Sequence, residues 1–241
     1  MRNPITRLAV AAVLVAVIGL GIFEFVTTGS KSGVVWAEVA RKVQASRSLI
    51  VRCTETKIDA SKAENYSIKY FSPTRSRTDS YKGGLLTQTF YDDYETMTAT
   101  AVFHTHKHYM SRPLKTSEGF LERHDDWMNP RYLVQRILSG EHRTLGQRAI
   151  DGVLCEGLET TDPAVLGPLP GPVNRLEVEM RLWVNAQTQY PVLFEGRMSG
   201  EVEGQVMGSK CVMDEFQWDV PLEPSLLEPN IPPDYLDMRK L

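Results

Sequence analysis

Apolar and polar side chains alternate along much of the chain, most regularly over residues 175–184, RLEVEMRLWV. Successive side chains of a β-strand point to opposite faces, so this pattern predicts a strand with one apolar and one solvated face. The apolar face carries Leu176, Val178, Met180, Leu182 and Val184. Runs rich in β-branched and aromatic residues, bounded by Pro, Gly and Asp, predict an antiparallel meander of further strands. These runs cover residues 48–58, 65–71, 75–81, 85–91, 96–103, 153–161, 191–198 and 206–218.

Two segments have the helical period instead. Apolar residues recur at i, i+3, i+4 and i+7 within residues 34–44, which predicts an amphipathic helix with one face on the domain. A second helix is expected to have Asn129 as its N-cap and Pro130 at its first position. An apolar stripe follows over residues 133–138, and Gly140 is the expected C′ residue.

The connections carry turn signals. Residues 150–153, Ile-Asp-Gly-Val, predict a tight hairpin. The Pro- and Gly-rich stretch 162–174 predicts an exposed loop. The tail from residue 218 to residue 236 is punctuated by prolines, and we expect it to wrap the edge of the domain.

An uncharged apolar run, residues 8–23, follows Arg2 and Arg7, a pattern that signal peptides and signal anchors share. The run exceeds a usual signal-peptide core of about 7–15 residues and no A-x-A cleavage site follows it, so we expect an anchor. A cleaved signal peptide is the alternative. The basic residues ahead of the run place the N-terminus in the cytoplasm. The expected organisation is a tail (1–7), a transmembrane signal anchor (8–26), a linker (27–33) and one extracytoplasmic domain (34–241).

The predicted fold class is α+β, mostly β: a large antiparallel sheet packed on a few helices. A sheet whose apolar face the helices cover incompletely retains an apolar groove or cavity. Flexible methionines on the late strands suit an adaptable pocket, although ordinary core packing explains them as well. The candidate groove residues are Leu176, Val178, Met180, Leu182, Met207 and Met213.

Composition narrows the class of protein. With 24% charged and 42% hydrophobic residues, the chain of 241 residues is neither disordered nor a multi-span membrane protein. A net charge of −3 without a basic face argues against nucleic-acid binding. Cys53, Cys155 and Cys211 lack zinc-site spacing, which leaves one disulfide plus a free thiol, or three small core residues.

Three histidines are the most conspicuous candidates for metal chemistry. His104, His106 and His108 would share one face of a strand, a geometry that a divalent metal could use if the strand bends. The alternative is a solvent-facing strand or hairpin end. His124 and the adjacent residues Asp125–Asp126 could add ligands only if folding brings them near.

Catalytic signatures are missing from the sequence: there is no G-x-S-x-G, no H-E-x-x-H and no glycine-rich phosphate loop. Ion pairing on a wet sheet face explains Glu177 and Glu179 beside Arg175 and Arg181. Trp183 interrupts that polar face, so it either caps the sheet edge or meets a helix or partner. We therefore expect no enzyme activity and no cofactor.

Four stretches resemble the bacterial LolA/LppX/RseB-like superfamily of exported domains: VVWAEV, AIDGVLCEGLE, LWVNAQTQYPVLFE and FQWDVPLEPSLLEPNIPPDY. The resemblance covers nearly all of the region after the anchor. It implies an incomplete (half) β-barrel wrapped over helices, which binds lipoprotein acyl chains or senses envelope stress together with anti-sigma factors. The chain departs from the carriers, which are soluble after signal cleavage, by its expected anchor. It departs from the sigma regulators because only about seven residues face the cytoplasm.

Two functions follow as expectations. The first is a binding domain on the bacterial inner membrane that holds an apolar ligand, a lipid or a lipoprotein acyl chain, in its half-barrel. The second is an envelope sensor or scaffold subunit that binds another envelope protein, such as a transmembrane sigma regulator. An open groove favours the first and a helix-filled one the second. An enzymatic third hypothesis depends on the histidine cluster alone.

Overall fold

The computed structural model describes residues 33–57, 65–114, 129–167, 173–202 and 204–240. The predicted cytoplasmic tail, the predicted anchor and nearly all of the linker lie outside these residues. Among the helices described, none has the length and apolar character needed to cross a membrane. From Val34 onward the chain forms one structural unit.

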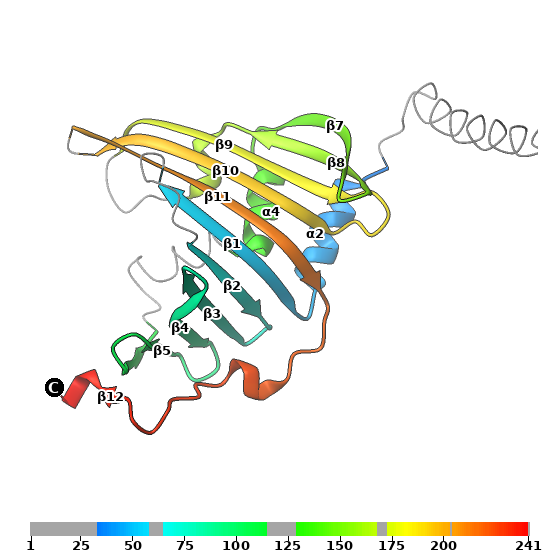
Figure 1. Cartoon of the computed structure of the whole chain (residues 1–241). Coiled ribbons are helices and arrows are strands. Elements are labelled where there is room, and N and C mark those ends of the chain that lie inside the picture. The colour runs from blue at the N-terminus through cyan, green and yellow to red at the C-terminus, as the bar shows by residue number, and fades with distance from the viewer. Residues whose placement is uncertain (1–32, 58–64, 115–128, 168–172, 203, 241) are drawn as a thin grey trace, which may run out of the picture. The chain divides into compact units, whose positions relative to one another are not determined.

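Twelve strands build one open sheet in the described part of the chain, in the order β12-β6-β5-β4-β3-β2-β1-β11-β10-β9-β8-β7 (Figure 1). Neighbouring strands are antiparallel except β12 and β6, which are parallel. The predominantly antiparallel sheet is confirmed and is consistent with an incomplete barrel. The strands are β1 (Leu49–Lys57), β2 (Asn65–Phe71), β3 (Arg75–Lys82), β4 (Leu85–Asp93), β5 (Thr98–Phe103), β6 (His108–Pro113), β7 (Arg143–Ile150), β8 (Val153–Thr160), β9 (Asn174–Asn185), β10 (Pro191–Val202), β11 (Gln205–Trp218) and β12 (Leu236–Asp237).

The helices α2 (Trp36–Ala45) and α4 (Pro130–Ser139) lie against one face of the sheet (Figure 1). The predicted N-cap is confirmed, because the Asn129 side chain accepts a hydrogen bond of 3.0 Å from the N–H of Arg131. Gly140 differs from the expectation. It is the C-cap with φ −93°, and its N–H still reaches the Arg136 carbonyl, so α4 ends one residue later than predicted.

One apolar cluster joins the helices to half of the sheet. Val39 and Val43 of α2 and the α4 residues 133, 134 and 137 pack against side chains of β1 and β8–β11. Of the described residues in β2–β6, Phe71 alone belongs to this cluster. The helical cover therefore lies over β1 and the C-terminal strands, and it leaves the same face of β2–β6 without helical cover from α2 and α4.

Two connections between strands can be compared with the turns predicted from the sequence. Asp151 (φ 49°) and Gly152 (φ 79°) are both left-handed, as the predicted tight hairpin requires. Of the predicted exposed loop at 162–174, residues 168–172 lie outside the described residues, and the part before them is not simply exposed. Pro163–Leu166 forms a 3-10 helix, η1, and the Asp162 side chain caps it by accepting a hydrogen bond from the N–H of Ala164. Val165 and Leu166 of this helix are buried in the core cluster.

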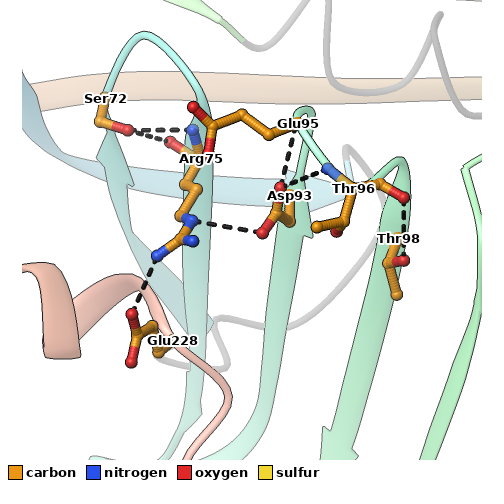
Figure 2. Close-up of polar contacts among 7 residues, drawn as sticks. All are labelled: Ser72, Arg75, Asp93, Glu95, Thr96, Thr98 and Glu228. Atoms are coloured by element: carbon orange, nitrogen blue, oxygen red, sulfur yellow. Dashed lines mark hydrogen bonds and ion pairs between the residues drawn. The ribbon is translucent and has the colours of Figure 1, made fainter.

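The C-terminal tail follows the face of β3 and β4 opposite the core, where Arg75 binds it. Arg75 contacts Asp93 at 3.3 Å and Glu228 of the tail at 3.0 Å (Figure 2). The tail also contains η2 (Pro224–Leu227) and η3 (Met238–Lys240), and β12 between them pairs with β6. The prediction that the tail wraps the domain edge is confirmed.

Candidate functional site

A groove of about 710 Å³ opens on the core-side face of the sheet, over β2–β6 and the adjoining part of β1. Cross-strand partners share one face, so the strand register shows how its floor is built. One row across the five strands consists of Lys69, Thr78, Phe90, Ala101 and Met110, each the register partner of the next. The groove therefore follows the hydrogen-bonding direction of the sheet, across the strands.

Flanking rows complete the lining. Ser67, Ser80, Gln88 and Phe103 form the row on one side. Asp92, Ala99 and Arg112 belong to the row on the other side. Small alanines beside the larger aromatic rings leave open space, because a methyl group fills little of the volume above the sheet.

The apolar part of the floor is centred on two aromatic rings. Phe90 and Phe103 meet edge to face, with ring centroids 6.5 Å apart. Phe90 keeps 37% of its surface exposed, although it sits on the face that carries the core elsewhere. Phe103 is half-buried. A partly exposed aromatic pair next to alanine and methionine is a surface on which an apolar chain loses contact with water.

Charged side chains lie around this apolar floor. Lys69 is 6% exposed, whereas Lys82 and Arg112 are exposed near the ends of their strands. The acidic lining residues are Glu55 and Asp92, and the Asp92 carboxylate accepts a hydrogen bond from the Ser76 hydroxyl at 3.1 Å. The groove is thus amphipathic: apolar in the middle and charged around it.

The six residues predicted from sequence are not brought together around this groove. Val178, Met180, Leu182 and Met213 are buried in the core cluster, at most 5% exposed. Leu176 is half-buried against the cluster. Met207 is 56% exposed near the end of the hairpin between β10 and β11. The geometry assigns the first four to packing under the helices.

The histidines occupy a hairpin end, and the predicted arrangement on one face of a strand is not found. His104 and His106 lie in the turn between β5 and β6, and His108 begins β6. His104 contacts the Thr89 hydroxyl at 3.0 Å and the Tyr235 hydroxyl at 3.1 Å, and burial lowers the pKa of its imidazole. Among the residues described, no group of His, Cys, Asp and Glu is arranged to hold a metal ion. The other predicted ligand candidates, 124–126, lie outside those residues.

The three cysteines are all buried and free. Cys53 on β1 and Cys211 on β11 bring their sulfur atoms to 3.5 Å, while the Cys155 thiol donates to the Val153 carbonyl on β8. The hydrogen bond between the two thiols lowers the pKa of Cys53 and, together with burial, raises that of Cys211. The structure therefore shows the second alternative from the sequence, three small core residues, and the disulfide of the first is not formed.

On the opposite face of the sheet, Trp183 packs on residues of its own sheet. It is 5% exposed, lies over Gly157, and has the Arg148 guanidinium 3.8 Å from its ring centroid. Nearby, the carboxylate of Glu159 accepts from Arg181 at 2.8 Å and also pairs with Arg143. The expected ion pairing on this wet face is present for Glu179, which pairs with Arg181, and for Arg175, which pairs with Glu201 on β10, whereas Glu177 accepts a hydrogen bond from Ser199. Trp183 caps the sheet there.

Sequence missed the groove residues Phe90, Ala101 and Phe103. A signal for them exists: residues 98–103, TATAVF, place two alanines and a phenylalanine on one face of the strand. A strand with such small side chains on its inner face leaves volume for something else.

Solved structures with a similar fold include two mycobacterial proteins. The lipoprotein LppX of Mycobacterium tuberculosis is 12% identical, with 78% of this chain and 95% of LppX covered and a TM-score of 0.46. LprF from Mycobacterium bovis is 15% identical, with coverages of 83% and 95% and a TM-score of 0.46. A DUF1329 family protein from Desulfovibrio piger is 14% identical, with coverages of 84% and 98% and a TM-score of 0.35.

No family model and no curated protein matches the chain. The chain is similar, at a TM-score of 0.46, to LppX, one of the proteins that give the resembled superfamily its name. At these identities and TM-scores the likeness concerns the fold alone. What the groove does is argued below from its own residues.

Proposed function

We propose that this domain is a binding module that holds an apolar ligand, a lipid or the acyl chain of a lipoprotein, in the groove over β2–β6. The observation that carries the proposal is the open apolar floor around Phe90, Ala101 and Phe103 on the sheet's core-side face. Burying apolar surface contributes about 25 cal/mol per Å², so an alkyl chain laid on this floor gains affinity without a specific polar contact. An open groove favours ligand binding over the sensor alternative.

Residues 8–26 are part of the same proposal, as a signal anchor that holds the domain on the outer face of the bacterial inner membrane. The support is the uncharged run after Arg2 and Arg7. An anchor on the same chain would keep a lipid-binding domain at the membrane, its source of ligand. Protease added to spheroplasts tests this: the domain is expected to be digested while the membrane stays intact, and a protected domain contradicts the topology.

Photo-crosslinking of the full chain tests the groove. The protein is placed in phosphatidylcholine nanodiscs with a diazirine-bearing fatty acid, irradiated, digested and mapped by mass spectrometry. Labels are expected in the peptides of β4–β6. Labels confined to β9–β11, or to residues 8–26, would remove the groove from consideration, and a chain that crosslinks in cells to another envelope protein only would favour the sensor.

A matched pair of substitutions makes the test specific. Ala101→Trp fills the middle of the floor and is expected to reduce labelling of β4–β6 several-fold. Ala149→Trp places the same ring at an exposed position of β7, outside the groove, and is expected to leave labelling unchanged. Equal labelling of both variants would show that the ligand does not occupy this floor.

A further inference from the structure

Lys69 stands out among the groove residues because its cationic side chain is buried. It lies on the groove face of β2 with 6% of its surface exposed. None of the hydrogen bonds and ion pairs found among the described residues ends at its ammonium group, and this nitrogen is not among their fully enclosed side-chain atoms without a partner, so it is open to the groove. Lysine is almost never fully buried unless paired, since an ammonium taken out of water without a counter-charge is strongly disfavoured.

The register partners of Lys69 explain its burial, and neither of them carries a charge. Its register partners are Val51 on β1 and Thr78 on β3. Thr78 lines the groove and carries no charge, and Val51 belongs to the core cluster. The Cys53 thiol is close enough for Lys69 to lower its pKa. The site is therefore a cation on the border between filled core and open groove.

The strand register shows which side chains follow Lys69 along the groove. From Lys69 the row continues through Thr78 to Phe90, Ala101 and Met110, so charge is followed by apolar surface. Neighbouring strands lie about 4.8 Å apart, so the four steps from β2 to β6 span about 19 Å along the sheet. Such a row matches a molecule with an anionic group at one end and an extended alkyl chain behind it.

We propose that Lys69 binds the anionic group of the ligand and that the groove selects single-chain amphiphiles carrying a carboxylate or a phosphate. This inference depends on the proposed function of the groove and names its ligand class. The lysine ammonium offers three donors, which suits either oxyanion. The alkyl chain lies across Phe90 toward Met110.

Three photoactivatable probes with the same alkyl chain test the proposal on the full chain in phosphatidylcholine nanodiscs: the free fatty acid, its methyl ester and the corresponding lysophosphatidate. Each probe partitions into the nanodiscs equally whichever variant they hold, so comparisons between variants report on the protein. The variants are Lys69→Met, which keeps the stem and removes the charge, Lys69→Arg, which keeps a cation, and Lys210→Met as an exposed control on β11. The readout is the labelling of β4–β6 peptides below saturation.

Lys69→Met is expected to lower labelling by the fatty acid, the lysophosphatidate or both about tenfold, because a charge-assisted contact is lost. Labelling by the methyl ester is expected to stay the same, and Lys69→Arg and Lys210→Met are expected to keep the anion preference. Which anionic probe responds tells carboxylate from phosphate. Unchanged labelling by both anions, or an equal loss of all three probes, would overturn the role of Lys69. If no probe labels the unmodified protein, the proposed function itself fails.

Discussion

Replacing Gly157 by alanine tests how tightly the outer face of the sheet is packed. Gly157 on β8 is the register partner of Trp183 on β9, and the indole lies over it. A Cβ at this position would lie 2.6 Å from Cζ3 of Trp183 and 2.7 Å from Cε3. Real Cβ atoms essentially never show such short contacts, so the ring must shift away from β8, which disturbs its stacking with the Arg148 guanidinium.

The magnitude follows from two opposing terms. Overpacking of a fixed aromatic ring costs about 1–3 kcal/mol. Replacing glycine by alanine also restricts the unfolded chain, which stabilises the fold by about 0.4–1 kcal/mol where the backbone allows it. Gly157 has an ordinary backbone conformation, so that gain applies. The variant is therefore expected to lose about 1–2 kcal/mol of unfolding free energy.

Urea denaturation followed by far-ultraviolet circular dichroism measures the change. The decisive comparison is a double-mutant cycle with Trp183→Leu, which removes the ring that the new methyl group meets. In that background Gly157→Ala is expected to be neutral or stabilising, because only the effect on the unfolded chain remains. Destabilisation of equal size in both backgrounds would refute the reasoning and place the cost in the backbone of β8.

Three further predictions concern other parts of the domain. Asn129→Ala is expected to lose about 1 kcal/mol of unfolding free energy, because α4 loses its N-cap acceptor, whereas Asn129→Asp retains it. Glu159→Gln is expected to be less stable at neutral pH. Hydrogen bonds from Arg181 and Arg143 lower the Glu159 pKa, so the carboxylate stabilises the fold fully above its ordinary pKa of 4.5, and this stabilisation disappears as the pH falls through the lower pKa of the folded protein. Denaturation of both proteins across this pH range shows whether their unfolding free energies converge at low pH. Oxidised glutathione is expected to join Cys53 to Cys211 and not to Cys155, with two hydrogens lost to the oxidant, and peptide mapping distinguishes the pairings.

The elements with strong local signals were predictable. The alternation over residues 175–184 identifies β9, and the Asn-Pro pair at 129–130 identifies the start of α4. Both depend on interactions within a few residues, which the sequence displays directly. The apolar side of β9 was also correct, since its even-numbered residues face the core.

The position of the groove was not predictable in the same way. Alternation tells which side of a strand is apolar, but it does not tell what lies above that side. Val178 and Phe90 both occupy the core-side face of the sheet, and only the docking of α2 and α4 decides that the first is covered and the second is open. That docking depends on contacts between distant segments, such as Gln44 with Gln135, which a single sequence does not reveal.

The strand order has a consequence for how the protein is made. β1 pairs with β11, so the first strand of the domain cannot complete its pairing until a strand some 160 residues later has been synthesised. In the same way, β6 pairs with β12, which comes more than 120 residues after it. Until then both strands present unpaired backbone edges, which invite association with other chains. A chain that stops before β11 therefore leaves this edge of β1 unpaired, and such a fragment is expected to associate with other chains and to be sensitive to protease.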